Sequence, residues 1–305
     1  MLKGLSLPFI KKSYYVSHPI KLFLYLMRTF GISQSQAQKM IDTRKVYQDG
    51  KPITDKAAVV EGEIEILEFV PKSIGLEPLF ETKDFAIYDK PSGIMVHPRN
   101  RKSGYTLIDE VRYRYGPSAN ITHRIDKETT GLVLVSKHKE AERIIKGMFE
   151  AKQIRKTYRA LVKGVIDKEL FIDAPILKNR DYSKVKLKVF VDERGKPAQT
   201  IIRPLRILEG KTLVEALPVT GRQHQIRAHL FHVKHPILGD PIYGVPTEAA
   251  IRYLDGELTL DERVALTGAK RLMLHAYSLE FEFRSVGYRI VSRYDLMQEL
   301  SDRTL

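Results

Sequence analysis

The chain has 305 residues, 43% of them hydrophobic, so it can bury a sizeable core, and we expect one large and one small domain. It has no cysteine, which excludes disulfide frameworks, thiolate zinc sites and cysteine nucleophiles. Its net charge of +14 favours a polyanionic partner, either nucleic acid or an anionic membrane surface. Since no run reaches the roughly 18 apolar residues of a membrane span and the start has no cleavage site, we expect a cytoplasmic protein without a membrane partner.

The first part of the chain is predicted to form a separate unit, residues 1–72. Residues 1–46 hold eight Lys or Arg and a single acid, Asp42. Several glutamates between 61 and 68 then make the local charge negative. The stretch 70–78 contains two prolines and a glycine, which is typical of a linker. We therefore expect a second domain over residues 79–305.

Within the first unit, the predicted elements are two helices, a hairpin and a strand. Apolar side chains between 22 and 27 indicate a first helix, and Ser33 can cap a second helix that runs to Ile41. Asp49-Gly50 between two short apolar segments is a strong hairpin signal, and the alternation over 63–69 indicates a further strand. An ordinary small α+β unit would show this order of elements as well.

A more specific match lies over 35–53, SQAQKMIDTRKVYQDGKPI, where a basic turn separates the second helix from the hairpin. This arrangement resembles the S4 RNA-binding domain. In that family the second helix and the following turn sit on RNA phosphates. The resemblance therefore implies that Lys39, Arg44 and Lys45 contact RNA.

Beyond the linker, predicted strands are separated by few helices. This content favours an α+β fold with a mixed or antiparallel sheet over a doubly wound parallel sheet. The predicted strands span 85–88, 131–136, 157–165, 185–191, 212–217 and 279–284, and the predicted helices lie at 106–115 and around 141–148.

The first segment that can carry chemistry is HRIDKETTG, residues 123–131, directly before a buried strand. Charged side chains crowd this loop, and a carboxylate at Asp126 would be held rigidly at the end of the sheet, where functional sites often lie. On this segment alone, a turn in which Asp126 only caps its own backbone is slightly favoured.

Two later segments add an aromatic side chain and a buried arginine. Tyr158 lies in the strand KTYRALV on the face shared with Ala160 and Val162, where an ordinary core tyrosine is the default interpretation. The segment TGRQHQIRAHL, residues 220–230, looks like a turn that enters a helix, and Arg227 falls next to the buried stripe of that helix. An arginine near the core requires a carboxylate partner.

HRIDKETTG, KTYRALVKG and TGRQHQIRAHLFHVKHPILGDPIYG, together with DKPSGIMVHP at 89–98, resemble the RluA-type pseudouridine synthases. The four segments occur in the order of that family, and the resemblance spans roughly residues 80–285. The family more often has Leu where Ile125 stands and Ser where Thr130 stands, and both changes are mild.

The resemblance implies a role for each of five residues. Asp126 matches the essential aspartate of the family, and Arg227 matches the basic residue that pairs with it. Tyr158 matches the tyrosine that stacks under the target base. Arg124 matches the arginine that fills the space left by a flipped nucleotide, and His123 beside it is expected to contact the RNA backbone.

The implied reaction is the isomerisation of uridine to pseudouridine, in which uracil leaves its N1 bond, rotates and rejoins through C5. A base inside an RNA helix must first be flipped out, and an inserted arginine and a stacking aromatic offset that cost. The aspartate must be ionised to act as nucleophile or base, so a paired arginine has to keep its pKa low. The tyrosine can then help to remove the C5 proton. No cofactor is required.

Structured RNA is the expected partner. Ribosomal RNA is expected first, because an accessory RNA-binding domain suits large RNAs, and transfer RNA is second. Nothing in the sequence implies a protein partner, so we expect a monomer.

Three other functions fit parts of the sequence. HRID suggests a phosphotransferase, but the chain lacks a GxGxxG loop and an Asp-Phe-Gly motif. His229, His232 and His235, with Asp240 nearby, suggest a metal hydrolase, but histidines at this helical spacing splay too widely, so we expect no metal site. A non-catalytic RNA-binding protein fits the charge, but pure binding does not need Asp126 with its tyrosine and arginine.

Overall fold

The computed structural model describes residues 8–100, 103–178, 185 and 187–298, and the chain divides into two compact units. The small unit comprises residues 1–73 and 98–105, and the large unit comprises residues 74–97 and 106–305. The division after residue 73 lies within the stretch predicted to be a linker. The segment 98–105 belongs to the small unit, although the sequence suggested a continuous second domain. Within the described ranges, no helix is long and apolar enough to span a membrane.

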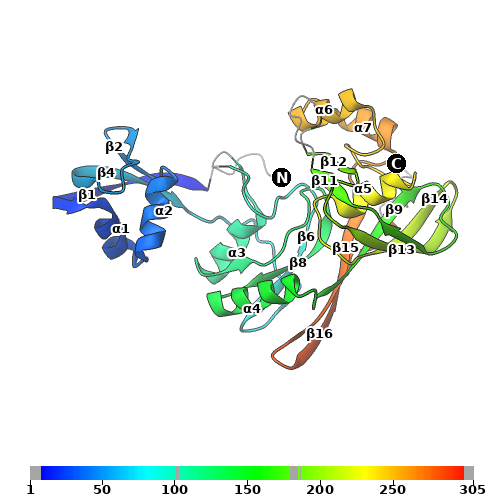
Figure 1. The fold of residues 1–305 in the computed structure, drawn as a ribbon, viewed down its shortest axis with the longest axis horizontal. Helices are drawn as coiled ribbons and strands as arrows, with labels where there is room; N and C mark the ends of the chain where they lie inside the picture. Colours follow the sequence, from blue (N-terminus) through cyan, green and yellow to red (C-terminus); the bar gives the residue numbers. More distant parts are fainter. Residues whose placement is uncertain (1–7, 101–102, 179–184, 186, 299–305) are drawn as a thin grey trace. The chain divides into compact units, whose positions relative to one another are not determined.

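The small unit combines a four-stranded sheet with two helices (Figure 1). Its elements are β1 Phe9–Lys21, α1 Leu22–Phe30, α2 Gln34–Asp42, β2 Val46–Gln48, β3 Lys51–Pro52 and β4 Val59–Phe69. The strands lie in the order β1-β4-β2-β3, and neighbouring strands are antiparallel. Apolar side chains of α1 and α2 fill the core against β2 and β4.

Local signals account for the predicted elements of the small unit. Ser33 and Gln36 form a capping box, in which each side chain accepts the backbone amide hydrogen of the other, and α2 begins there. Asp49 and Gly50 both have positive φ, 50° and 74°, as a tight turn between β2 and β3 requires. The sequence did not predict β1, because this strand is largely exposed on both faces and lacks a regular alternation.

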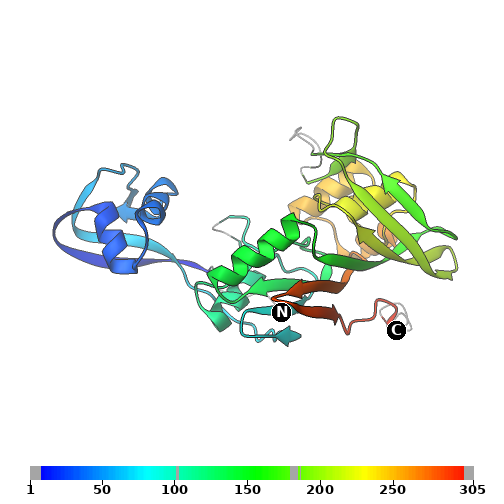
Figure 2. The ribbon, with the colours of Figure 1, turned by 60° about the horizontal axis from the view of Figure 1, so that its bottom comes forward.

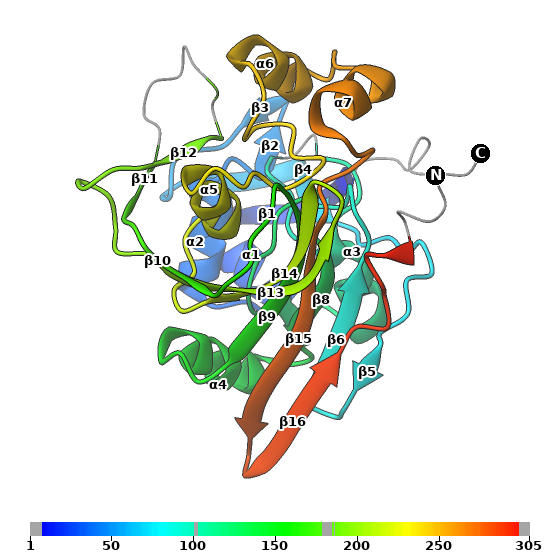
Figure 3. The same cartoon turned by 90° about the vertical axis from the view of Figure 1, so that its right-hand side faces the viewer.

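A ten-stranded sheet forms the scaffold of the large unit (Figure 3). Its strands are β5 Phe80–Glu81, β6 Phe85–Lys90, β7 Asn120–Ile121, β8 Thr130–Ser136, β9 Arg155–Lys163, β10 Leu170–Asp173, β13 Gln199–Leu208, β14 Lys211–Pro218, β15 Leu274–Phe283 and β16 Val286–Val291. They lie in the order β10-β13-β14-β9-β15-β8-β6-β5, with β16 beside β15 and β7 beside β8. In the described part of this sheet β15 and β8 are parallel and the other pairs antiparallel. The predicted α+β fold with a mixed sheet is confirmed.

Two helices pack against this sheet, and each forms a separate hydrophobic cluster with it. Helix α4, Lys139–Glu150, packs on β6, β8 and β15, and Figure 2 shows it (green) lying over these strands. Helix α5, Gln225–His232, packs on β9 and β14 through Ile226 and Leu230, which form the buried stripe of this helix. The remaining elements are α3 Leu107–Tyr115, α6 Thr247–Asp255, α7 Leu260–Thr267 and the strand pair β11 Ile176–Lys178 and β12 Val189–Val191.

Several elements of the large unit were not predicted, among them β13, α6 and α7, and one predicted strand is shorter in the structure. Strand β13 contains Pro204 and is mostly exposed in its second half, so its pattern does not read as a strand. Helix α7 has eight residues and leaves a weak periodic signal. Helix α6 is clearly amphipathic over its nine residues, so its pattern could have been recognised. Of the predicted strand 185–191, the last three residues form β12, and Lys186 lies outside the described residues.

Candidate active site

Asp126 lies in the loop that leads into β8, a strand whose residues are all buried. Two side chains, one from the last residue of β6 and one from the segment after it, hold this loop. The amino group of Lys90, which is fully buried so that its pKa falls to about 7, donates to the carbonyl of Lys127 at 3.1 Å. The hydroxyl of Ser92 donates to the carbonyl of Glu128 at 3.0 Å. These backbone contacts on the two residues after Asp126 fix the place from which its carboxyl group projects.

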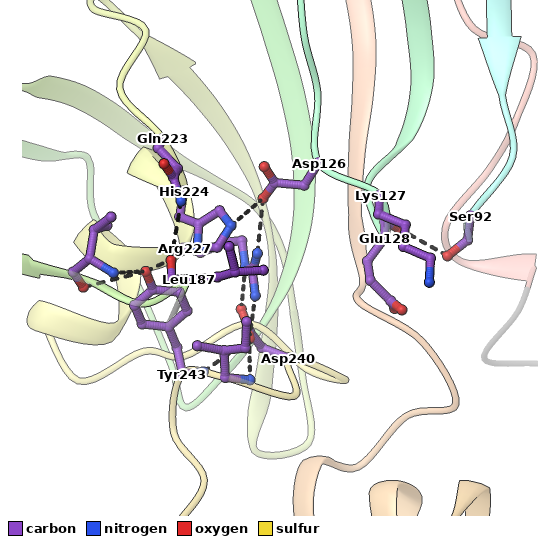
Figure 4. A network of polar contacts seen from close by, with 12 residues as sticks. Ser92, Asp126, Lys127, Glu128, Leu187, Gln223, His224, Arg227, Asp240 and Tyr243 are labelled. Carbon is purple, nitrogen blue, oxygen red and sulfur yellow. Dashed lines mark hydrogen bonds and ion pairs between the residues drawn. The ribbon is translucent and has the colours of Figure 1, made fainter. Parts of the chain in front are cut away.

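A buried arginine binds that carboxyl group (Figure 4). Nη1 of Arg227 lies 2.9 Å from Oδ2 of Asp126. The other edge of the guanidinium holds Asp240 in a bidentate pair, with Nε at 2.7 Å from Oδ2 and Nη2 at 2.9 Å from Oδ1. Asp240 in turn accepts the amide hydrogens of Ile242 and Tyr243 at 2.9 and 3.0 Å. Because the planar guanidinium is bound on both edges, it has one orientation in the site.

The surroundings keep Asp126 ionised. Burial opposes ionisation, but the neighbouring His224 and Arg227 hold the pKa of Asp126 below its ordinary value. Burial lowers the pKa of His224 to about 4, so its ring is neutral near pH 7 and the positive charge comes from Arg227. His224 Nε2 lies 3.7 Å from Oδ2 of Asp126, and its Nδ1 lies 3.2 Å from the hydroxyl of Tyr243. The Asp126 side chain remains 27% exposed, so a ligand can reach it.

Tyr158 lines the same pocket as Asp126, from strand β9. Its ring packs against the core cluster of β9 and α5 but is not fully covered. Burial and the charge of Asp126 raise the pKa of Tyr158, so its hydroxyl is protonated near pH 7. That hydroxyl has no hydrogen-bond partner among the described residues. Arg124, which is exposed, completes the rim, so four of the five residues singled out by the family resemblance line one pocket.

His123 makes tertiary contacts at the start of the Asp126 loop, and its expected contact with the RNA backbone stays a prediction. Its Nε2 accepts the amide hydrogen of Leu134 at 2.9 Å, and its ring lies over Phe149 at 4.7 Å between centroids. Burial lowers the pKa of His123 to about 3, so the ring carries no charge near pH 7. The side chain mainly fixes the start of the Asp126 loop, a tertiary contact that the sequence could not show.

The residues expected to bind RNA in the small unit lie on and after α2. Lys39 is exposed in the last turn of this helix. Arg44 is exposed and has a left-handed φ of 54°, and Lys45 follows it at the entry to β2. All three residues lie within seven positions of the chain, and their contact with RNA stays a prediction.

Three residues around Asp126 and Arg227 were not assigned to the site from the sequence: His224, Asp240 and Tyr243. Asp240 had a detectable signal, since Asp in the turn Gly-Asp-Pro can accept backbone amides two and three residues ahead. It was considered only as a neighbour of the histidines. His224 sits in a left-handed conformation, φ 51°, just before α5, and no local pattern predicts this.

Two of the three histidines in α5 and the following turn bind separate backbone carbonyls, and the third, His232, is exposed. His229 Nε2 donates to the carbonyl of Ala174 at 2.9 Å, and His235 Nδ1 donates to the carbonyl of Lys163 at 2.9 Å. The carboxylate of Asp240 is bound by Arg227. In the part of the chain that the structure describes, no three His, Asp or Glu side chains gather closely enough to hold a metal ion.

A groove of about 1000 Å³ opens beside the pocket and shares Arg124, Lys156 and Tyr158 with it. Lys156 is half-buried, burial lowers its pKa, and it has no carboxylate partner within the described ranges. Such a groove suits a polyanionic strand. Its charged lining consists of Arg124, Lys152, Arg155, Lys156, Arg203, Arg222 and a single acid, Glu150.

Both the sequence and the fold of this chain are similar to those of known proteins. The family described as RNA pseudouridylate synthase matches residues 84–232, which include the Asp126 loop, β9 and α5. An uncharacterized RNA pseudouridine synthase of Helicobacter pylori strain J99 is 34% identical over 289 residues, 94% of this chain and 96% of that relative. The ribosomal large subunit pseudouridine synthase D of Nitrosomonas europaea is 34% identical over 81% of this chain and 72% of its own length.

A solved structure supports the same fold. Human RNA pseudouridylate synthase domain containing 1 aligns with a TM-score of 0.58 at 24% identity, over 73% of this chain and 86% of that one. Given this shared fold and 34% identity along nearly the whole length of a relative, the chain belongs to the RluA-type RNA pseudouridine synthases, which are isomerases that act on RNA.

Proposed function

We propose that this enzyme isomerises specific uridines of large-subunit ribosomal RNA, with Asp126 as its catalytic group. The observation that carries the proposal is the contact of 2.9 Å between Asp126 and Arg227 at the wall of an open pocket. The choice of RNA rests on relatives from Nitrosomonas europaea and Pasteurella multocida, which are named ribosomal large subunit pseudouridine synthases. Transfer RNA is the alternative target, and a non-catalytic RNA-binding protein is the alternative activity.

Asp126 has the charge that the reaction needs. Detaching uracil requires a carboxylate that attacks the sugar or the base, or one that first removes a proton, and each of these roles needs the ionised form. The pKa of Asp126 is lowered in the folded protein, so its ionisation adds stability above the ordinary pKa of about 3.9, and this contribution is lost as the pH falls through the lowered value. We therefore expect no titration of Asp126 in the rate between about pH 5 and 8.

Tyr158 and Arg124 fit the binding of a base that has left its helix. Tyr158 presents a half-covered ring beside Asp126, on which uracil can stack. Arg124 stands exposed at the rim, where it can enter the gap in the RNA helix. Because the Tyr158 hydroxyl is protonated near pH 7, it can take the C5 proton only as it passes its own proton to a base in the same step, and Asp126 lines the same pocket and can be the acceptor.

The rest of the substrate would lie on basic surfaces. The groove beside the pocket can bind the backbone that flanks the target uridine. The S4-like small unit would add phosphate contacts through Lys39, Arg44 and Lys45. Since all the proposed catalytic side chains come from one chain, we propose that the enzyme works as a monomer, in the cytoplasm.

The proposal is tested with Asp126→Asn, which keeps the shape of the side chain and removes its charge. We expect tritium release from C5-labelled uridine in RNA to fall below detection, while the protein still folds and RNA binding survives. The thermal melting point should fall, because the buried Arg227 loses one of its two carboxylate partners. Asp167→Asn, an exposed position, serves as the control. Near-normal turnover by a folded Asp126→Asn protein would sink the assignment.

The RNA target is tested by mapping pseudouridines in total RNA with and without the gene. We expect the missing sites to lie in large-subunit ribosomal RNA. Loss of sites in transfer RNA alone would favour the alternative target.

A further inference from the structure

The Asp126 loop is also held from the side of α6 and α7, through Glu128. Figure 4 shows Glu128 pointing away from Asp126, so the two carboxylates face different partners. Arg263 of α7 places Nη2 at 2.6 Å from Oε2 of Glu128, and the hydroxyl of Tyr253 in α6 donates to Oε1 at 2.7 Å. Only 11% of the Arg263 side chain and 14% of the Glu128 side chain are exposed, so solvent weakens this pair little.

Helix α7 is joined to the turn that carries Asp240 as well. Nη2 of Arg263 donates to the carbonyl of Gly239 at 2.7 Å, and the amide of Gly239 donates to the carbonyl of Thr267 at 3.1 Å. Gly239 has a φ of 74°, and a Cβ at this position would lie 1.6 Å from the carbonyl oxygen of Arg271. The turn is therefore packed so closely that it cannot shift without moving its neighbours.

One guanidinium nitrogen thus connects the two sides of the site. On one side it holds Glu128, two residues after Asp126, and on the other it holds Gly239, next to the carboxylate that orients Arg227. We propose that Arg263 is a positioning residue, which sets the distance between the carboxylate of Asp126 and the guanidinium of Arg227. This inference rests on the proposed catalytic role of Asp126.

The chemistry of the pair explains why an arginine would be needed. Burial opposes the ionisation of Glu128, but its hydrogen bonds to Arg263 and Tyr253 keep its pKa below the ordinary value, so the pair is charged. A guanidinium can donate in two directions with fixed geometry, whereas a lysine ammonium is a point charge on a flexible chain. Without Arg263 the loop would still be held by Lys90 and Ser92, but it would lose its connection to the Asp240 turn through Glu128. Arg227 would then be left to link Asp126 to Asp240.

The test compares variants of the full-length enzyme in single-turnover rate and in RNA affinity, measured separately. We expect Arg263→Met to slow the single turnover by about 10- to 100-fold, the size of effect that a small misplacement of reacting groups produces. Its Kd for RNA should stay within about twofold of wild type, because Arg263 is buried away from the groove lining. Arg263→Lys should restore part of the rate.

A matched control lies on the same helix pair. Arg252 of α6 binds Glu262 of α7 in a pair whose side chains are 44% and 40% exposed, and neither residue touches the Asp126 loop. Arg252→Gln therefore also loosens the contact between α6 and α7, but we expect it to change neither the rate nor the affinity.

The outcomes separate positioning from mere stability. If folded Arg263→Met turns over at the wild-type rate, or loses rate only in step with affinity, the positioning role is wrong. If Arg263→Met does not fold, Glu128→Gln decides, since it keeps size and an acceptor oxygen: a slower turnover at unchanged affinity supports the role, and a wild-type rate overturns it. An active Asp126→Asn measured alongside overturns both proposals, whereas an inactive Asp126→Asn beside a fully active Arg263→Met rejects only the positioning role.

Discussion

The pocket and the groove beside it carry their charges in different surroundings. In the pocket, Arg227 is 3% exposed and binds two carboxylates at 2.7 to 2.9 Å. In the groove, the side chain of Arg155 is 60% exposed and its nearest acid, Glu280, lies 3.8 Å away. Buried charges depend on each other's geometry, so removing one leaves another unpaired at high cost. Exposed cations act nearly independently and are screened by salt, so the groove can lose one cation and still bind.

The sharpest way to break the pocket is Asp240→Asn. This change keeps the volume but removes the charge that holds Arg227, and it can place an amide NH₂ against the guanidinium. Because a buried cation would lose its bidentate partner, we expect the free energy of unfolding to fall by about 3–5 kcal/mol. With Arg227 misplaced, we expect the single-turnover rate to fall by about 100-fold.

Chemical denaturation and single-turnover assays on one preparation measure both effects. The control is Asp192→Asn, which breaks an ion pair with Arg194, a side chain that is 80% exposed. This change should leave the rate unchanged. A stable, fully active Asp240→Asn enzyme would show that Arg227 is oriented by other contacts.

The same contrast explains which features could be predicted from the sequence. Helix α2 and the turn at Asp49 and Gly50 depend on neighbours within a few residues, so local patterns predicted them. The strand β1 is stabilised by pairing with β4, which lies far along the chain, and its own side chains carry no clear pattern. As with α2 and the turn, patterns within short segments made the prediction possible for the pocket: the motifs predicted that Asp126, Tyr158 and Arg227 lie together.

The partners of these residues were harder to predict, because their contacts form only in the tertiary structure. Glu128 and its arginine are 135 positions apart in the chain, and Arg263 lies in a helix that the pattern did not reveal. Asp240 is only 13 positions from its arginine, but a turn of the chain after α5 brings them together. For His123, the motif correctly indicated its location but gave no sign that its ring binds the amide of Leu134.

A smaller and more selective effect is expected for Tyr158→Phe, at the border between pocket and groove. Since the hydroxyl makes no hydrogen bond within the described structure, its removal should leave stability and RNA affinity near wild type. If the hydroxyl takes part in proton transfer, the rate should fall by about 100-fold, with uracil already rotated but still carrying its C5 proton. Tritium release and product analysis in one time course check this. Turnover at the wild-type rate would confine Tyr158 to stacking and leave the C5 proton to Asp126.

The smallest effects are expected on the exposed surfaces, and they should appear in binding rather than in chemistry. Lys152→Gln with Arg155→Gln removes two cations from the groove, and Arg44→Gln with Lys45→Gln removes two from the small unit. If each cation binds one phosphate of a flexible strand, each pair should lower the slope of log K against log salt by about 0.7 for every phosphate that is no longer neutralised.

The single-turnover rate at saturating enzyme should stay within about twofold in both pairs, because phosphate contacts position RNA without entering the reaction. Lys168→Gln with Lys270→Gln, two exposed lysines outside the groove lining, removes the same charge and is the control for net charge alone. If the small-unit pair gives the slope of this control, Arg44 and Lys45 do not contact RNA, and the S4-like assignment loses its functional basis. If the groove pair lowers the rate at saturation, the groove helps to shape the reacting geometry, and its cations are not independent of the pocket.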